Sequence, residues 1–220
     1  MTKKELIFLG PPACGKGTQT NKLAEYLKFP HVDTGSLLRN EIKNNTEAGI
    51  EAKKFIDKGQ LVPADLVAKI IKNRLSKDDC KNGYILDGYP RSLEQAEKLE
   101  IINQEINSDN NDVDFRAIYF DIDTNILVER IVNRRSCPVC GEIYNLEFKP
   151  PKKEGYCDKD GAELVQRKDD TREVAQARFD TYNHETAPLI DYYKQKGVLK
   201  TIDANGSIDE VWERLLEVIK

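Results

Sequence analysis

The segment GPPACGKGT, residues 10–18, decides how this sequence is read. It follows a short apolar run, 5–9, typical of a buried parallel strand, and leads into a helical pattern over 18–27. A loop in that context can bind phosphate, because the N–H groups and dipole of the helix N-terminus attract an anion and Lys16 adds a mobile cation. A second glycine separates Lys16 from Thr18, so the match to the phosphate-loop pattern is imperfect. The alternative is a glycine-rich turn that carries a solvated lysine.

Apolar and helical patterns alternate along the rest of the chain. Further strand candidates are 84–86, 117–120 and 198–202. Helical patterns cover 36–44, 47–58, 64–75, 92–106, 124–133, 171–195 and 208–219. Ser207 and Glu210 form a capping-box signature at the start of the last of these. Strands that alternate with helices predict an α/β fold in which helices cover both faces of a parallel sheet.

Two stretches interrupt this alternation. Residues 33–62 show two short helices with no strand between them. Residues 134–170 are rich in Cys, Gly, Pro, Tyr and Lys and suit a small irregular lobe. The polar stretch 103–114 is expected to be a surface loop. The sequence therefore predicts one unit with two inserted lobes, and its core comprises 1–32, 63–133 and 171–220.

The composition limits the classes of protein. Charged residues make up 33% and hydrophobic residues 39% of the 220 residues, the balance of a globular protein. The net charge of −4 and the lack of a basic stripe disfavour nucleic-acid binding. No apolar run approaches the roughly 18 residues that span a bilayer, and the N-terminal region is too short for a signal-peptide core. We therefore expect a cytoplasmic protein without a nucleic-acid or membrane partner.

The cysteines of the second lobe have the spacing of a metal site. Cys137 and Cys140 form a C-x-x-C knuckle, and Cys157 with Asp160 repeats that spacing with a carboxylate as the last group. Three thiolates and one carboxylate complete a closed tetrahedral site, which indicates structural Zn²⁺. A lobe this small cannot build a core of its own, so a metal would stabilise it. Asp158 is the rival fourth ligand, and free cysteines are the alternative to a metal site.

The GKGT sequence at 15–18 resembles the phosphate loop of adenylate kinases and related nucleoside monophosphate kinases. The resemblance extends over nearly the whole chain, because further motifs of that family occur in the same order. These are DTGSLLR at 33–39, GQLVP at 59–63, DGYPR at 87–91 with Gln95, the pair Arg130 and Arg134, RKDD at 167–170, and Arg178.

Three features depart from the family pattern. Ala13 stands where many members have glycine, so we expect a backbone there that needs no conformation reached only by glycine. Ser36 stands where an aspartate is common, and the connection 101–112 is longer than usual. None of these departures removes a charge that the reaction needs.

The resemblance implies a P-loop kinase fold with an AMP-binding lobe at 33–62 and a zinc-binding lid at 134–170. It implies reversible phosphoryl transfer from Mg-ATP to AMP, giving two ADP, by a monomer that serves nucleotide homeostasis. The implied cofactors are Mg²⁺, bound with ATP, and a structural Zn²⁺ held by Cys137, Cys140, Cys157 and Asp160.

The resemblance also implies the residues of the nucleotide sites. Those implied to bind ATP are Ala13, Cys14, Gly15, Lys16, Gly17, Thr18, Arg130, Arg134, Ile143, Tyr144 and Gly206. Those implied to bind AMP are Thr34, Arg39, Gln60, Leu61, Val62, Gly88, Tyr89, Pro90, Arg91, Gln95, Arg167 and Arg178. Those implied to act in catalysis are Lys16, Arg91, Arg130, Arg134, Arg167, Arg178 and Asp87.

A cluster of cations suits phosphoryl transfer, because the enzyme's contribution is mainly positioning and neutralisation of charge. Arginine suits the role, since its planar fork pairs with two phosphate oxygens. Arg130 and Arg134 are four apart and are expected on one helix, so that they share a face, although two solvated arginines would look the same. Arg91 follows the strand 84–87, at the edge where open α/β sheets bind ligands.

Asp87, at the end of the same strand, is expected to hold Mg²⁺ through water, since Mg²⁺ keeps most of its hydration shell. A turn cap is the alternative. His31 and His184 are the only histidines of the sequence, and we expect a structural role for His31.

Alternatives remain for the function. Thr34 and Gln95 match family positions that recognise the adenine of AMP, which favours AMP as the acceptor. The donor base is less constrained, so a GTP:AMP phosphotransferase is an alternative, as is a UMP/CMP kinase. From another class, a nucleotide-responsive zinc protein without turnover is possible, but the full set of arginines disfavours it.

Overall fold

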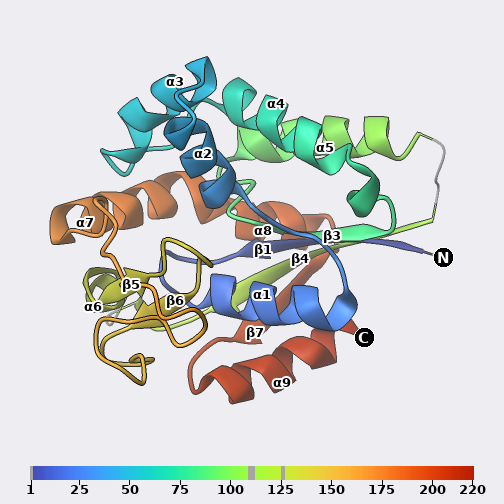
Figure 1. Ribbon diagram of the computed structural model, residues 1–220. Coiled ribbons are helices and arrows are strands. Elements are labelled where there is room, and N and C mark those ends of the chain that lie inside the picture. Colours follow the sequence, from blue (N-terminus) through green and yellow to red (C-terminus); the bar gives the residue numbers. More distant parts are fainter. Residues whose placement is uncertain (1, 109–111, 125–126) are drawn as a thin grey trace.

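The computed structural model describes residues 2–108, 112–124 and 127–220 of the chain. Its centre is a 5-stranded parallel sheet with the strand order β2-β3-β1-β4-β7 (Figure 1). The strands are β1 (Lys3–Leu9), β2 (His31–Asp33), β3 (Gly83–Asp87), β4 (Val113–Asp121) and β7 (Leu199–Asp203). The α/β fold predicted from the sequence is confirmed.

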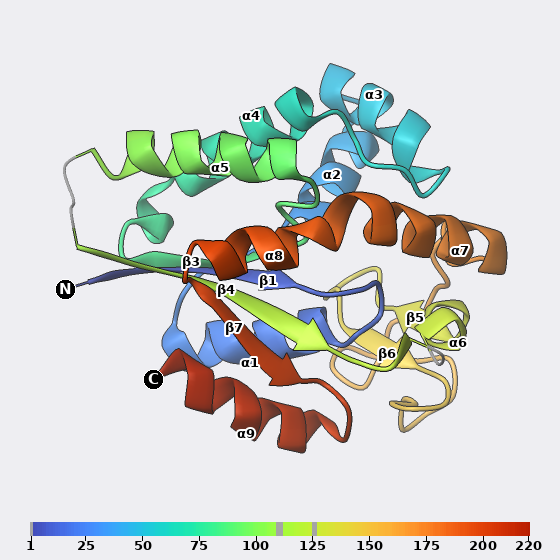
Figure 2. The ribbon, with the colours of Figure 1, turned by 180° about the vertical axis from the view of Figure 1, so that it is seen from behind.

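Helices cover both faces of the sheet. The helices of the described residues are α1 (Lys16–Leu27), α2 (Thr34–Lys43), α3 (Glu47–Ile56), α4 (Ala64–Leu75), α5 (Leu93–Ile106), α6 (Leu127–Val132), α7 (Arg172–Thr181), α8 (Pro188–Gln195) and α9 (Ile208–Ile219). Figures 1 and 2 show α1 and α9 on one face and α4, α5 and α8 on the other. None of the helices in the described ranges has both the length and the apolar character needed to cross a membrane.

Each face of the sheet has its own apolar core, because successive residues of a strand point to opposite faces. Ile7 and Leu9 of β1 belong to the core that includes residues of α4, α5 and α8. Leu6 and Phe8 of the same strand belong to the core that includes residues of α1 and α9. Full burial of each such side chain stabilises the fold by about 1.5–3 kcal/mol. Residues 6–9 of β1 are buried on both faces, which explains why they form a continuous apolar run.

The helix predictions agree best with the structure at α4 and α9, whose observed bounds are those predicted. The capping box at the start of α9 is confirmed: Ser207 Oγ accepts from the backbone N–H of Glu210, and Glu210 Oε2 accepts from that of Ser207. The loop expected over 103–114 is shorter than predicted, because α5 continues to Ile106 and β4 begins at Val113. Part of it, 109–111, lies outside the described residues.

The helical stretch predicted over 171–195 is present, but it is not one regular α-helix. A π-helical turn (Tyr182–Thr186) separates α7 from α8. Pro188 has no N–H to donate, and the N–H of Ala187 donates to the carbonyl of Tyr182 at 2.8 Å, five residues back. The helix therefore widens before α8 begins.

Residues 134–170, hereafter the lid segment, are mostly irregular, as expected. They also contain a hairpin that the sequence did not indicate, in which β5 (Arg134–Ser136) pairs antiparallel with β6 (Ile143–Asn145). Ser136 forms a further bridge with Val165 near the other end of the segment. The chain therefore enters and leaves the lid segment at neighbouring points.

Candidate active site

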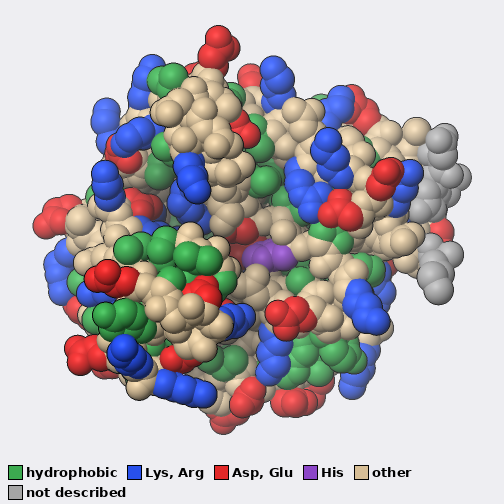
Figure 3. Space-filling model, viewed as in Figure 1, with side chains coloured by type: hydrophobic (Ala, Val, Ile, Leu, Met, Phe, Trp, Pro, Cys, Tyr) green, Lys and Arg blue, Asp and Glu red, His purple; other side chains and the backbone are tan. Residues whose placement is uncertain are grey.

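A cavity of about 1070 Å³ opens at the carboxyl edge of the sheet, where β1, β2 and β3 end. Figure 3 looks across the strands and shows Lys and Arg side chains interspersed with Asp and Glu on that face. Every cation that the sequence predicts for the site lines the cavity: Lys16, Arg39, Arg91, Arg130, Arg134, Arg167 and Arg178. They come from distant parts of the chain, so the fold concentrates positive charge in one concave site. Such a site suits a ligand with several negative charges.

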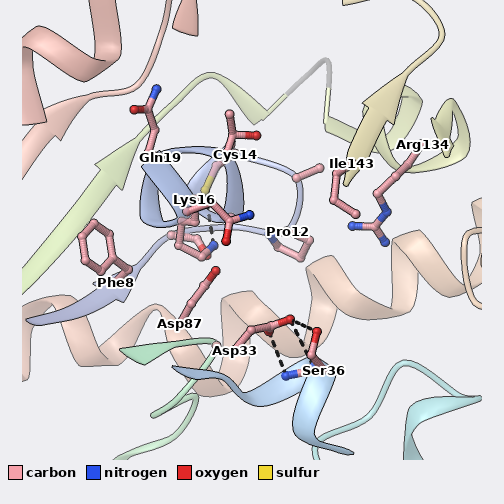
Figure 4. Close-up of a pocket in the computed structure, with 18 of the residues that line it drawn as sticks. Phe8, Pro12, Cys14, Lys16, Gln19, Asp33, Ser36, Asp87, Arg134 and Ile143 are labelled. Atoms are coloured by element: carbon pink, nitrogen blue, oxygen red, sulfur yellow. Dashed lines mark hydrogen bonds between the residues drawn. The ribbon is translucent and has the colours of Figure 1, made fainter. Parts of the chain in front are cut away.

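The glycine-containing loop forms one wall of the cavity (Figure 4). Gly15, at φ 93°, caps α1, and the helix begins at Lys16. The first N–H groups of a helix have no partner within it and attract anions. Lys16 Nζ donates to the carbonyl oxygens of Gly10 at 2.6 Å and Pro11 at 3.0 Å. The lysine is thus held across the loop, where an anion would compete with these carbonyls for it.

Ala13 adopts a left-handed backbone conformation, with φ 61°. Alanine reaches this conformation at a cost of roughly 1–2 kcal/mol, whereas glycine adopts it freely. We expect Ala13→Gly to raise the free energy of unfolding by about 1 kcal/mol and the melting temperature by about 2–4 °C, as measured by calorimetry. The control, Ala24→Gly within α1, should lower the melting temperature. An unchanged or lower melting temperature for Ala13→Gly would contradict the strain assigned to Ala13.

Two aspartates hold arginines at the wall formed by α7 and the lid segment. Asp170 is fully buried and accepts from Arg134 through both oxygens, with 2.9 Å between Arg134 Nε and Asp170 Oδ2. Arg178 pairs with Asp169, and its Nη1 lies 3.5 Å from Asp170 Oδ1. The pair of Arg134 and Asp170 joins the two ends of the lid segment.

The pKa values of three arginines in the cavity are lowered. Desolvation and, to a smaller extent, the charge of Arg134 lower the pKa of Arg167 to about 10. Desolvation also lowers the pKa of Arg178 and that of Arg91, and Arg91 is further affected by the charge of Arg178. The guanidinium groups are crowded and partly stripped of water, so a bound anion would relieve their mutual repulsion.

Arg130 and Arg134 both face the cavity, but the prediction that they lie on one helix is wrong. α6 ends at Val132, and Arg134 begins β5. The guanidinium of Arg130 lies 4.8 Å from the ring centroid of Phe148. Its Nε is buried, and no hydrogen-bond partner for it exists among the described residues. A planar guanidinium stacked in this way suits a planar ligand such as a nucleobase.

Asp87 points into the cavity opposite the loop (Figure 4). Its Oδ2 accepts from Thr20 Oγ1 at 3.3 Å and lies 3.6 Å from His31 Nε2. Burial alone would raise the pKa of Asp87, but the contact with His31 and the charge of Lys16 outweigh it and lower the pKa. The ionised carboxylate beside a phosphate loop is a suitable partner for a hydrated Mg²⁺.

A smaller pocket of about 90 Å³ shares Arg39, Arg91 and Arg178 with the main cavity. Six further residues predicted to bind AMP line it: Thr34, Gln60, Leu61, Val62, Gly88 and Gln95. Thr34 Oγ1 is buried and has no hydrogen-bond partner in the part of the chain that the structure describes. Gln95 Oε1 accepts from the N–H of Arg91 at 2.8 Å, which orients the amide. The pocket therefore offers apolar walls and polar groups next to the arginines.

The remaining residues predicted to bind nucleotides also line the main cavity, with one exception. The group comprises Ala13, Cys14, Gly15, Gly17, Thr18, Ile143, Tyr144, Gly206 and Pro90. The exception is the side chain of Tyr89, which is fully buried in the apolar core and lines neither cavity.

The cavity is also lined by residues that the sequence did not assign to the site, among them His31, Asp33, Ser36 and Phe148. His31 and Asp33 belong to β2, which is too short to give an apolar pattern. β2 pairs with β3, and the register aligns Asp33 with Asp87. Two aspartates at the ends of neighbouring parallel strands would have been a usable signal, had β2 been predicted.

The lid segment gathers the predicted metal ligands Cys137, Cys140, Cys157 and Asp160, whose ligand atoms lie within 4.8 Å of one another. Cys140 Sγ lies 3.6 Å from Cys157 Sγ, a separation that suits two thiolates on one tetrahedral ion. Backbone N–H groups donate to the sulfurs of Cys137 and Cys157 at 3.4 Å. The rival ligand, Asp158, instead accepts from the N–H of Lys152 at 2.9 Å. Cys137, Cys140, Cys157 and Asp160 could therefore hold a metal ion.

Comparison with known proteins agrees with this site. The family model described as adenylate kinase matches residues 8–198. The adenylate kinase of Caldanaerobacter subterraneus subsp. tengcongensis is 45% identical over 214 residues, which cover 97% of this chain and 95% of the relative. That of Clostridium perfringens strain SM101 is 42% identical over 217 residues, 98% of each chain. That of Clostridium tetani is 44% identical over 214 residues, 97% of each chain.

Proposed function

Because the chain belongs to the adenylate kinase family and is an ATP:AMP phosphotransferase, we propose that its cavity binds both nucleotides with their phosphates facing each other. The convergence of Lys16 and the arginines on that one cavity carries the proposal. Two bound nucleotides bring together phosphates that repel, and such a cluster of cations offsets the repulsion.

The loop and the lid segment form the ATP side of the site. The N–H groups at the start of α1 cradle the phosphates, and Lys16 exchanges its loop carbonyls for phosphate oxygens. Arg130, stacked on Phe148, contacts the base, and Arg134 binds phosphate. Ile143, Tyr144 and Gly206 complete the wall around the base and ribose.

The smaller pocket forms the AMP side of the site. The hydroxyl of Thr34 lacks a partner and Gln95 presents an oriented amide, so both suit the polar edge of adenine. Arg39 and Arg91 bind the AMP phosphate from the rim that the two pockets share. We infer AMP as the acceptor on these contacts.

The transfer itself needs charge placed around the moving phosphoryl group. Arg91, Arg167 and Arg178 line the cavity and supply forked donors for its oxygens. Asp87 would hold, through water, the Mg²⁺ that accompanies ATP, and that ion would neutralise phosphate charge. We further propose that residues 33–62 and the lid segment close over the nucleotides, since water would otherwise compete with AMP. The monomeric state and the cytoplasmic location stay predictions from the sequence.

A coupled assay with each nucleoside monophosphate and triphosphate tests the proposal. We expect the highest kcat/KM with ATP and AMP. A higher value with GTP as donor, or with UMP or CMP as acceptor, would favour the alternative kinases. Nucleotide binding without turnover would contradict the phosphotransferase itself.

We propose that Cys137, Cys140, Cys157 and Asp160 bind a structural Zn²⁺, because the donor set is that of a closed tetrahedral site and the small lid segment has little core of its own. Chelation of the metal should lower the melting temperature while turnover at low temperature is largely kept. Melting curves and cool-temperature assays on the same chelated sample measure both. Loss of turnover while the chain is still folded would show instead that the metal acts in catalysis.

The fourth ligand can be tested separately. The purified protein should contain about one zinc per chain, as a closed four-ligand site implies. Asp160→Ala should lose zinc more readily than its matched control, Asp158→Ala, since only Asp160 faces the thiols. The reverse order in metal analysis would assign the fourth ligand to Asp158.

A further inference from the structure

Asp33 does more than cap a helix. It ends β2 and is the N-cap of α2, where its carboxylate accepts from the N–H groups of Gly35 at 3.0 Å and Ser36 at 3.1 Å. Asparagine and serine serve as caps about as well as aspartate, so this role alone does not require a charge. The same carboxylate also accepts from the hydroxyl of Ser36 and from Arg39 Nη2, the latter at 3.3 Å.

The guanidinium of Arg39 folds back over the start of its own helix. A Cβ on Gly35 would lie 3.0 Å from Arg39 Nη1 and 3.3 Å from Asp33 Oδ1, so the missing side chain makes room for both groups. Arg39 Nη2 donates to Asp33 and, at 3.0 Å, to Ser36 Oγ. Within the described residues, no hydrogen bond engages the other nitrogens of this guanidinium. One nitrogen of the guanidinium, Nη2, is anchored, and the other two nitrogens are available to a ligand at the cavity rim.

We propose that Asp33 is a positioning residue that holds Arg39 in the orientation in which it receives the phosphate of AMP. The inference rests on the proposed function, which assigns Arg39 to AMP. Ser36 links the two groups, because its hydroxyl donates to the Asp33 carboxylate and accepts from Arg39 Nη2.

The sign of the change in AMP affinity, when the charge of Asp33 is removed, separates a positioning role from simple electrostatic repulsion. Asp33 lies at the rim where the AMP phosphate binds, and its charge also acts on Arg91. A carboxylate near a phosphate repels it, so removal of the charge alone would tighten AMP binding. If the carboxylate positions Arg39, its removal weakens AMP binding instead. The two effects have opposite signs.

Calorimetric titration of AMP into Asp33→Asn, together with steady-state kinetics, provides the test. Asparagine keeps the cap and removes the charge. We expect AMP affinity to fall about threefold to fivefold, as for a partly exposed ion pair, with kcat and the KM for ATP within about twofold. The matched control Asp65→Asn removes an equally negative, exposed residue in the first turn of α4, where it pairs with Lys98, and should leave AMP binding unchanged.

A charge relocation completes the test. Asp33→Ser should weaken AMP binding like Asp33→Asn, and the double variant Asp33→Ser/Ser36→Asp should restore it to within about twofold, since residue 36 already contacts Arg39. Unchanged or tighter AMP binding in Asp33→Asn, or no recovery in the double variant, would overturn the proposal. Arg39→Ala tests separately whether Arg39 itself binds AMP. If that variant binds AMP normally, the assignment of Arg39 to AMP fails. If it binds AMP weakly while Asp33→Asn does not, only the positioning role fails.

Discussion

Lys16→Ala should reduce kcat by about 10²–10³-fold, the loss typical of removing one group that stabilises transition-state charge. Lys16 Nζ donates to the carbonyls of Gly10 and Pro11 at the centre of the phosphate loop. From there its flexible side chain can place a positive charge beside the phosphoryl group as that group is transferred. Coupled steady-state assays at saturating ATP and AMP measure the effect.

The fold should survive this substitution, because the ammonium group of Lys16 hydrogen-bonds only to residues of the loop among the described residues. Melting temperature and calorimetric binding of AMP alone should match the unmodified protein. Lys22→Ala is the matched control. Lys22 also lies on α1, but it does not line the cavity, and its Nζ lies 3.0 Å from Asp209 Oδ1. Its loss should leave kcat unchanged. Turnover of Lys16→Ala within about threefold of the unmodified protein would exclude the transition-state role assigned to the lysine.

Arg91→Ala should lower kcat by about a hundredfold and raise the KM for AMP as well. Arg91 Nε donates to the carbonyl of Gly88 at 2.8 Å, which turns the guanidinium toward both pockets. It can therefore contact AMP in the ground state and the transferring group in the transition state. Varying AMP at saturating ATP separates the two parameters.

Two variants sharpen this prediction. Arg91→Lys keeps the charge but loses the planar fork, so it should retain KM better than kcat. Arg172→Ala, which removes an exposed arginine that pairs with Glu129, should have no effect on either parameter. If Arg91→Ala leaves both kcat and the KM for AMP unchanged, the arginine has no part in the reaction.

The sequence predicts the central sheet and the helices well, because long buried runs and capped amphipathic stretches carry strong local signals. It fails where the signal is short. β2 has only Val32 as an apolar residue, so nothing in its pattern indicates a strand. That omission hid the contact between His31 and Asp87, since only the pairing of β2 with β3 brings them together.

Other failures arise where tertiary structure overrides a local pattern. The helical pattern over 171–195 is continuous, but Pro188 forces a wider turn that no periodicity reveals. The spacing of Arg130 and Arg134 suggests one helix face, whereas the chain leaves the helix between them and still brings both to the cavity. Tyr89 belongs to a motif of the active site, yet its side chain packs into the core. A motif does not show which of its residues contact the ligand and which support the site from behind.

The buried pair of Arg134 and Asp170 has a consequence for how the lid segment can vary. It joins the first residue of the segment to the last, and the bridge between Ser136 and Val165 fastens the same base. The segment therefore starts and ends at one fastened base, and its further contacts with the preceding helix, from Asn145, Leu146 and Phe148, fall on residues 130–133. Doubling the length of such a closed loop adds only about 0.6 kcal/mol of closure entropy. The lid segment can therefore be shortened or rebuilt without a change in the register of the sheet.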